Sequence, residues 1–145
     1  MTGTWDGNDE LTHRCALELG VCMLDQCLVV EAARFLANAR RAAMRTLGEN
    51  HVMVYEFLWR CAQATYMIHF FGGNQYRGQL ISSVEGHVRA LVWTINTFGA
   101  KHPMTFEIRA SLKLCFDEQL DWTLGDFPQG IFEDLAEILR PTARA

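Results

Sequence analysis

Apolar residues recur along much of this chain at steps of three and four positions, a spacing that gathers them on one face of an α-helix. The clearest stripe consists of Ala32, Leu36, Ala39, Ala43 and Leu47. Polar or glycine-bearing stretches interrupt the pattern, as expected between helices. The pattern therefore predicts an all-α protein, with helices over residues 9–24, 29–47, 52–71, 79–98, 103–122 and 131–139.

The stripes also predict which side of each helix faces the core. In the first predicted helix the stripe is Leu11, Cys15, Leu19 and Cys22. In the third and fourth helices the stripes are Val54, Leu58, Cys61, Ala62 and Thr65, and Leu80, Val84, Val88, Leu91 and Ile95. Cys15 and Cys22 are accordingly expected to be buried as small hydrophobic side chains.

Short connections between the predicted helices favour antiparallel neighbours. We expect a single domain of three helix hairpins, spanning about residues 9–47, 52–98 and 103–140, with a polar tail at 141–145. Each hairpin buries its second face only by stacking on another hairpin. The end hairpins therefore expose apolar surface, and we expect either caps from the sixth helix and the Trp5 region or self-association through a terminal face.

Two segments of the chain are alike at a fixed offset of 51 residues. Leu47–Glu56 and Phe98–Glu107 share Gly, His, Met and Glu in the same register, with an aromatic residue before each Glu. Gly48 and Gly99 are predicted to end helices, as glycine does just after a helix C-cap. Pro103 suits the first position of a helix, where its missing N–H would have no partner in any case.

On these residues the chain resembles the tetratricopeptide repeats of the kinesin-light-chain type, whose units read roughly G-x-Y-x-E-A and then L-G-x-x-H-P. Glu31-Ala32 stands sixteen residues before Leu47-Gly48, as in that family, and Ala39 and Ala90 occupy its helix-packing alanine. The match covers about residues 27–116. The resemblance implies a right-handed superhelical array whose first helices line a concave, protein-binding surface. A more distant resemblance is to the helical C-terminal domain of the SET-and-MYND methyltransferases.

The chain departs from the family pattern at several positions. Cys27 stands where the first opening glycine would be, and Val52 replaces the first proline of the His-Pro pair. About nine extra residues lie around Phe70–Gly78. The family's peptide-clamping asparagine pair falls on Trp59-Arg60 and Ala110-Ser111, so its backbone-clamping role is not carried over to this chain.

Composition narrows the classes of function. A net charge of −4 argues against a general nucleic-acid binder. The sequence has no apolar run of membrane-spanning length, and the acidic first ten residues do not have the apolar core of a secretory signal. Five cysteines without close pairing predict free thiols, no metal, no cofactor and a cytoplasmic location.

Side chains on the first helices of the array are the candidates for a partner-binding groove: Tyr55, Trp59, Arg60 and Phe106. Aromatic and arginine residues dominate the binding energy of many protein interfaces. Packing of Trp59 and Phe106 between hairpins is an equally open interpretation.

A basic stripe and two histidines are further candidates. Arg34, Arg41 and Arg45 share one helix face, which suits an acidic peptide or a phosphate, but a solvated helix face is the interpretation we favour. His51 and His102 recur at equivalent places, and we interpret them as caps or turn-packing residues at the helix starts.

These features predict a non-catalytic adaptor or scaffold module that binds another protein or peptide. The sequence contains no recognisable nucleophile motif, zinc motif or phosphate loop. Two alternatives stay open. One is a regulatory or accessory helical domain associated with an enzyme, and the other is a small helical ligand-binding protein with its pocket at residues 70–76.

Overall fold

The computed structural model describes residues 10–72 and 77–117, which form five α-helices and no strand. They are α1 (Glu10–Asp25), α2 (Val29–Leu47), α3 (Val52–Gly72), α4 (Arg77–Phe98) and α5 (Pro103–Asp117). The all-α prediction is confirmed, and α2, α3 and α5 begin at the predicted residues. The predicted sixth helix at 131–139, the tail at 141–145 and the Trp5 region lie outside the described residues.

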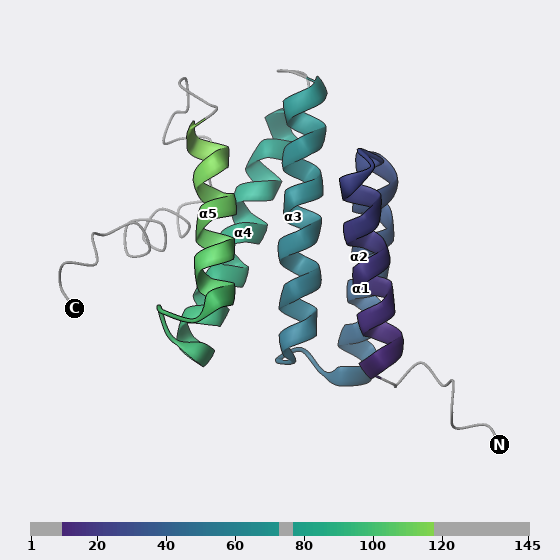
Figure 1. Cartoon of the computed structure of the whole chain (residues 1–145), viewed down its shortest axis with the longest axis vertical. Helices are drawn as coiled ribbons and strands as arrows, with labels where there is room; N and C mark the ends of the chain where they lie inside the picture. Colours follow the sequence, from purple (N-terminus) through teal and green to yellow (C-terminus); the bar gives the residue numbers. More distant parts are fainter. Residues whose placement is uncertain (1–9, 73–76, 118–145) are drawn as a thin grey trace.

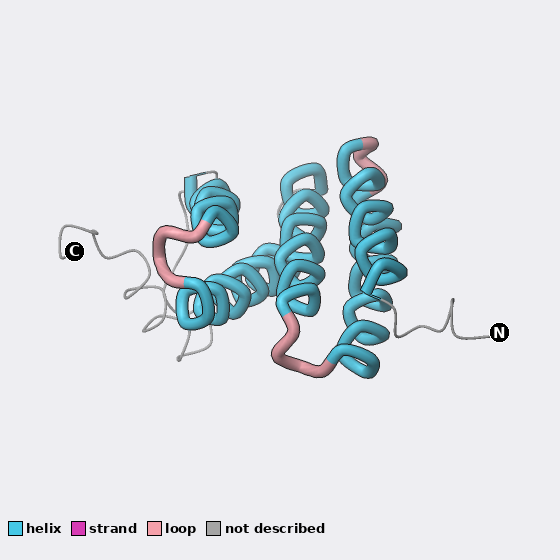
Figure 2. Tube along the Cα trace, turned by 60° about the horizontal axis from the view of Figure 1, so that its bottom comes forward, coloured by secondary structure: helices cyan, strands magenta, loops and turns pink. Residues whose placement is uncertain are grey.

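The helices pack on one another in chain order, and α3 also contacts both α1 and α5. Figure 1 shows α3 in the middle, with α1 and α2 on one side of it and α4 and α5 on the other. In Figure 1 the loops at 48–51 and 99–102 lie at the same end of the molecule, opposite the turn between α1 and α2. Figure 2 shows these connections in pink. The odd-numbered helices α1, α3 and α5 are therefore neighbours, although none follows another directly in the chain.

Two clusters of buried side chains form the described core, and α3 contributes to both. Val54, Phe57 and Ala64 pack with residues of α1 and α2. Leu58 and Trp59 pack with residues of α4 and α5. The helix is apolar on most of its circumference because it separates the two clusters.

The predicted inner faces of α2, α3 and α4 are largely confirmed. Ala32, Leu36 and Ala43 on α2 are fully buried. On α3 and α4 the buried members of the predicted stripes are Val54, Leu58, Ala62, Leu80, Val84, Val88 and Leu91.

The prediction for α1 is wrong. Its buried residues are His13, Leu17, Gly20 and Leu24, on the opposite side from the predicted stripe. Leu11 and Leu19 are 59% and 52% exposed, and Cys15 and Cys22 are exposed as well.

A close contact between α1 and α2 and a side-chain contact at His13 explain which side of α1 is buried. A Cβ atom at Gly20 would overlap the side chain of Leu36, so the glycine lets α1 approach α2 closely. The His13 Nε2 and Thr46 Oγ1 atoms lie 2.7 Å apart, which links the same side of α1 to the end of α2. The spacing of hydrophobic residues in the sequence predicts neither of these contacts.

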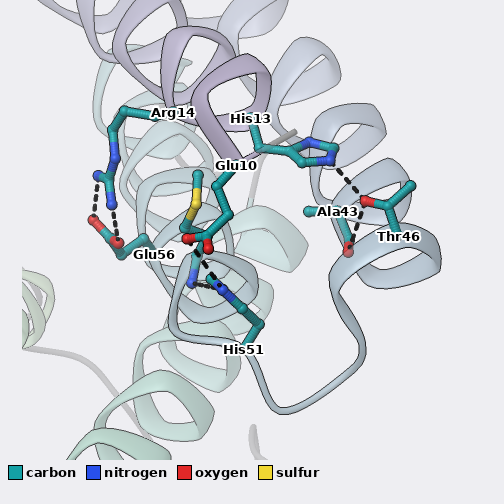
Figure 3. Close-up of polar contacts among 8 residues, drawn as sticks. Glu10, His13, Arg14, Ala43, Thr46, His51 and Glu56 are labelled. Carbon is teal, nitrogen blue, oxygen red and sulfur yellow. Dashed lines mark hydrogen bonds and ion pairs between the residues drawn. The ribbon is translucent and has the colours of Figure 1, made fainter. Parts of the chain in front are cut away.

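Polar side-chain contacts also fasten α1 to α3 and to the loop before α3, at the end of the molecule shown in Figure 3. Arg14 donates two hydrogen bonds to the carboxylate of Glu56, both at 3.0 Å. Glu10 lies 3.4 Å from Nε2 of His51. The two-point geometry of the Arg14–Glu56 pair fixes direction as well as distance.

The two glycines of the repeated segment have similar positive φ angles. Gly48 has φ of 92° and Gly99 has φ of 99°, in the region that side chains with a Cβ rarely adopt. Each amide N–H donates to the carbonyl four residues earlier, at Met44 and Ile95. Both glycines end their helices at equivalent points.

The two histidines of the repeated segment have matching contacts. Nδ1 of His51 accepts the backbone N–H of Met53 at 3.1 Å, and Nδ1 of His102 accepts that of Met104 at 3.1 Å. Each histidine immediately precedes its helix, so it satisfies one of the N–H groups that have no partner within the helix. Pro103 is the first residue of α5.

The extra residues around 70–78 lengthen two helices. α3 has 21 residues and α4 has 22, compared with 16 in α1 and 19 in α2. Phe70 and Phe71 are exposed at the end of α3 and meet edge to face, with ring centroids 5.3 Å apart. Residues 73–76 lie outside the described part of the chain.

Candidate functional site

A hollow of about 260 Å³ opens between α1, α3 and α5. Its lining residues are Val21, Leu24, Asp25, Arg60, Gln63, Tyr66, Met67, Ser111 and Leu114. Apolar side chains from all three helices flank a polar centre made by Arg60, Gln63 and Ser111. A mostly apolar lining with a few placed polar groups is typical of binding sites in proteins.

The polar centre is held together by hydrogen bonds that run from α3 to α5. Nη1 of Arg60 donates to Oε1 of Gln63 at 2.9 Å. Nε2 of Gln63 donates to Oγ of Ser111 at 3.3 Å. Ser111 Oγ lies 2.7 Å from Nε2 of His87 on α4, so three helices share one chain of contacts.

His87 is the buried end of this chain of contacts. Its Nδ1 lies 2.8 Å from the carbonyl oxygen of Ser83. Because a carbonyl only accepts, Nδ1 carries the proton and Nε2 accepts the hydroxyl of Ser111. Burial lowers the pKa of His87 to about 4, so the imidazole is neutral at physiological pH. The Ser83 hydroxyl donates to the carbonyl of Ala62 at 2.5 Å, which ties α4 to α3.

Serine and histidine can act as a nucleophile and its general base, but the low pKa of His87 makes the Ser111–His87 pair poorly suited to catalysis. A general base is most effective with a pKa near the working pH, and a pKa of about 4 makes His87 a weak base at neutrality. We interpret the contact as structural, because it fixes the position of Ser111 at the wall of the hollow.

Arg60 brings a positive charge to the hollow. Its guanidinium lies 4.0 Å from the centre of the Trp59 ring, an attractive cation–π arrangement. Burial lowers the pKa of Arg60, and the carboxylates of Glu107 and Glu56 act in the opposite direction. An arginine remains protonated in proteins, so the site presents a cation among carboxylates.

Arg60 is the one member of the predicted groove set that lines the hollow in the described structure. Trp59 is only 4% exposed and belongs to the core between α3, α4 and α5, which corresponds to the packing interpretation. Tyr55 stacks on Trp93 with ring centroids 4.4 Å apart and an interplanar angle of 9°. Phe106 is 54% exposed on α5.

The predicted basic stripe lies on the exposed face of α2. Arg34, Arg41 and Arg45 are exposed there, and Nη1 of Arg41 donates to Oδ1 of Asn38 at 2.6 Å. Arg40 is half-buried, and burial followed by the charge of Arg89 lowers its pKa. None of these arginines lines the hollow described above.

The five cysteines are free, with Cys15, Cys22 and Cys27 exposed. Burial raises the pKa of Cys61 and brings that of Cys115 to about 11, so these two thiols remain protonated at neutral pH. Within residues 10–72 and 77–117, no group of three or more His, Cys, Asp or Glu side chains is placed to hold a metal ion.

The sequence analysis does not predict Gln63 or His87 as site residues, nor the contacts that connect them through Ser111. Ser111 was noted only as part of a departure from the family pattern. The bonds join residues 24 and 48 positions apart, and no local spacing predicts such partners. Ser83 and His87 are four residues apart on α4, but that spacing is common on helices.

Comparison with known proteins found no matching family model, no matching curated protein and no matching solved structure. Among the helices described here, none is both long and apolar enough to cross a membrane.

Proposed function

We propose that the chain forms a tetratricopeptide-like array in which α1–α2 and α3–α4 are hairpins and α5 begins a third. The contacts of α3 with both α1 and α5 support this arrangement, because first helices of stacked hairpins are neighbours. The matched geometry of the turns at Gly48 and Gly99 supports it as well.

We propose further that the array is a non-catalytic binding module, and that a partner protein or peptide occupies the hollow between α1, α3 and α5. The observation that carries this proposal is the polar centre of Arg60, Gln63 and Ser111, which is flanked by apolar side chains of all three helices and by Asp25 at the end of α1. Arg60 and Ser111 stand at the second position of the family's clamping pair, on equivalent helices. Their arginine and hydroxyl groups differ from two asparagines, so we expect contacts to partner side chains rather than to an extended backbone.

Selection of binding peptides from a displayed random library against the full chain tests this function. The affinity of the selected peptide is then measured for wild type and for Leu114→Glu. Leu114 lines the hollow and is 53% exposed, so a charge there blocks the site without disturbing the core. We expect binding to weaken at least about tenfold, since a buried apolar contact is replaced by a charge.

Phe106→Glu is the matched control, because Phe106 lies on the same helix, is 54% exposed and is outside the lining. Binding that survives Leu114→Glu, or that is lost equally with Phe106→Glu, would place the partner on another surface. Circular dichroism of both variants verifies that the helices are intact.

A further inference from the structure

The hollow belongs to a longer groove whose walls are equivalent positions of α1, α3 and α5. Counted from the helix starts, the fifth residues of the three helices are Arg14, Glu56 and Glu107. The ninth residues of α1 and α3 are Glu18 and Arg60, one helical turn further along. Arg60 lines the hollow, so the charged fifth residues stand about one turn beyond it.

Carboxylates outnumber cations along this groove. Arg14 is already paired with Glu56 through two hydrogen bonds at 3.0 Å. Glu18, Glu107 and Asp25 are exposed, and none of them forms an ion pair with another side chain in residues 10–72 and 77–117. Four carboxylates thus stand against the two guanidinium groups of Arg14 and Arg60, which gives the groove a net charge of −2.

Arg60 already has partners of its own. Its Nη1 atom donates to Gln63 at 2.9 Å, and its guanidinium lies over the Trp59 ring. Burial lowers the pKa of Arg60, and the charges of the same four carboxylates raise it, so each carboxylate is close enough to act on this one cation. An acidic group of a partner would have to enter among these carboxylates and would be repelled by them.

The other cations of α5 do not face the groove. Arg109 and Lys113 are the seventh and eleventh residues of α5. The residues at these positions in α3 are Leu58 and Ala62, which are buried on the side of α3 that packs against α4. The corresponding side of α5 points away from α3, so neither cation offsets the acidic charge of the groove wall.

Apolar side chains lie between the acidic ends of the groove. Leu114, Val21 and Met67 line the hollow, and Leu114 is 53% exposed. Glu18 and Asp25 are seven residues apart on α1, a distance of about 10 Å along the helix. A complementary occupant therefore presents apolar groups over about 10 Å, with positive charge at both ends of that stretch.

We propose that the occupant of the hollow is a basic segment of a partner protein, in which lysine or arginine side chains flank a short apolar stretch. The basic side chains contact Glu18 and Glu107 at one end of the hollow and Asp25 at the other. The apolar side chains contact Leu114 between them. This inference rests on the proposed binding function and adds the chemistry of the partner. If the segment is extended, about 10 Å spans three residues, so two apolar residues separate the basic ones.

The peptides selected from the displayed random library against the full chain test this chemistry. Leu114→Ser removes an apolar contact without adding a charge, so peptides that lose affinity for this variant occupy the hollow. We expect such peptides to contain more lysine and arginine than aspartate and glutamate. Their affinity should fall between about 20 mM and about 500 mM salt, because salt screens the attraction. An excess of acidic residues, or an affinity that does not change with salt, overturns the proposal.

Charge reversal at the groove wall gives a second readout, measured by fluorescence anisotropy with the tightest hollow-bound peptide. Glu107→Lys should raise its dissociation constant at least about fivefold at about 20 mM salt. Glu31→Lys is the matched control, because Glu31 is exposed on α2, outside the groove, and the change in net charge is the same. Circular dichroism verifies that both variants keep their helices.

The outcomes separate this inference from the proposed function. If no selected peptide responds to Leu114→Ser, the hollow is not the binding site and both proposals are wrong. If peptides respond to Leu114→Ser but bind Glu107→Lys as tightly as Glu31→Lys, or more tightly, the hollow binds a partner that is not basic. That result overturns only the inferred chemistry.

Discussion

Among single residues, His87 gives the folded chain a specific dependence on pH. Burial lowers its pKa to about 4 from the ordinary value of 6.5. Above pH 6.5 neither the folded nor the unfolded chain binds a proton at this imidazole. Between about pH 6.5 and about pH 4 only the unfolded chain binds one, so the free energy of unfolding falls as the pH falls and levels off below about pH 4. The whole shift corresponds to about 3 kcal/mol.

Chemical denaturation of wild type and His87→Gln between about pH 7.5 and about pH 4 measures this effect. Glutamine has no proton to bind, and every other titrating group is common to both chains. The stability advantage of wild type should therefore shrink towards acid pH by about 3 kcal/mol. An advantage that stays constant across the range would show that His87 is accessible to protons in the folded state.

Cys27 is a second residue whose local chemistry predicts a measurable effect. It has φ of 61°, a conformation that favours glycine, and it forms the turn in which Cys27 N–H bonds to Leu24 and Leu28 N–H bonds to Met23. Cys27→Gly relieves the steric conflict of the Cβ atom and should stabilise the chain by about 1 kcal/mol. Cys27→Ala retains the Cβ atom and serves as the control. Thermal unfolding under reducing conditions measures the midpoints of the two variants. A lower midpoint for Cys27→Gly than for Cys27→Ala would contradict the inferred backbone strain at Cys27.

Between elements, the contact of α1 with α2 depends on Gly20. A methyl group there would overlap the Leu36 side chain, so Gly20→Ala should push the two helices apart and destabilise the chain by about 1 to 3 kcal/mol. Gly78→Ala is the matched control, because Gly78 is also within a helix but has no atom within 4 Å of the added methyl group. That substitution should be neutral or slightly stabilising, since alanine favours helix over glycine. Urea denaturation gives the free energy of unfolding of each variant and so distinguishes an effect of packing from an effect of helix propensity. Equal changes in this free energy for the two variants would rule out the packing effect.

The elements also show where sequence reasoning succeeds and where it stops. Helices α3 and α5 begin at the predicted residues because the histidine caps, the preceding glycines and Pro103 act locally. α2 also begins as predicted, although Leu28 before it makes no side-chain cap. The buried side of α1 was predicted wrongly because spacing detects an apolar stripe but not whether a neighbouring helix covers it. For a similar reason, the sequence predicts only part of the candidate site between α1, α3 and α5. Arg60 stands out as a charged residue on a first helix, whereas Gln63, Ser111 and His87 meet only through packing of three helices.

At the scale of the whole molecule, α3 is the most interconnected of the described helices, whereas α1 lies to one side of it. α3 contacts α1, α2, α4 and α5, while α1 contacts α2 and α3 and leaves the stripe around Leu19 exposed. Local opening of α1 therefore exposes less buried surface than opening of α3. The free energy of local opening follows the packing that is lost, so the two helices should differ in stability within one folded chain.

Native-state hydrogen exchange followed by mass spectrometry tests this order of stability. At low protein concentration the amides of α1 should exchange at least about tenfold faster than those of α3, which corresponds to about 1.4 kcal/mol in opening free energy. Equal protection of α1 and α3 at low concentration would mean that both helices open only by global unfolding. In that case the Arg14–Glu56 pair and the Gly20 contact would bind α1 to the rest of the chain more tightly than its exposed stripe implies.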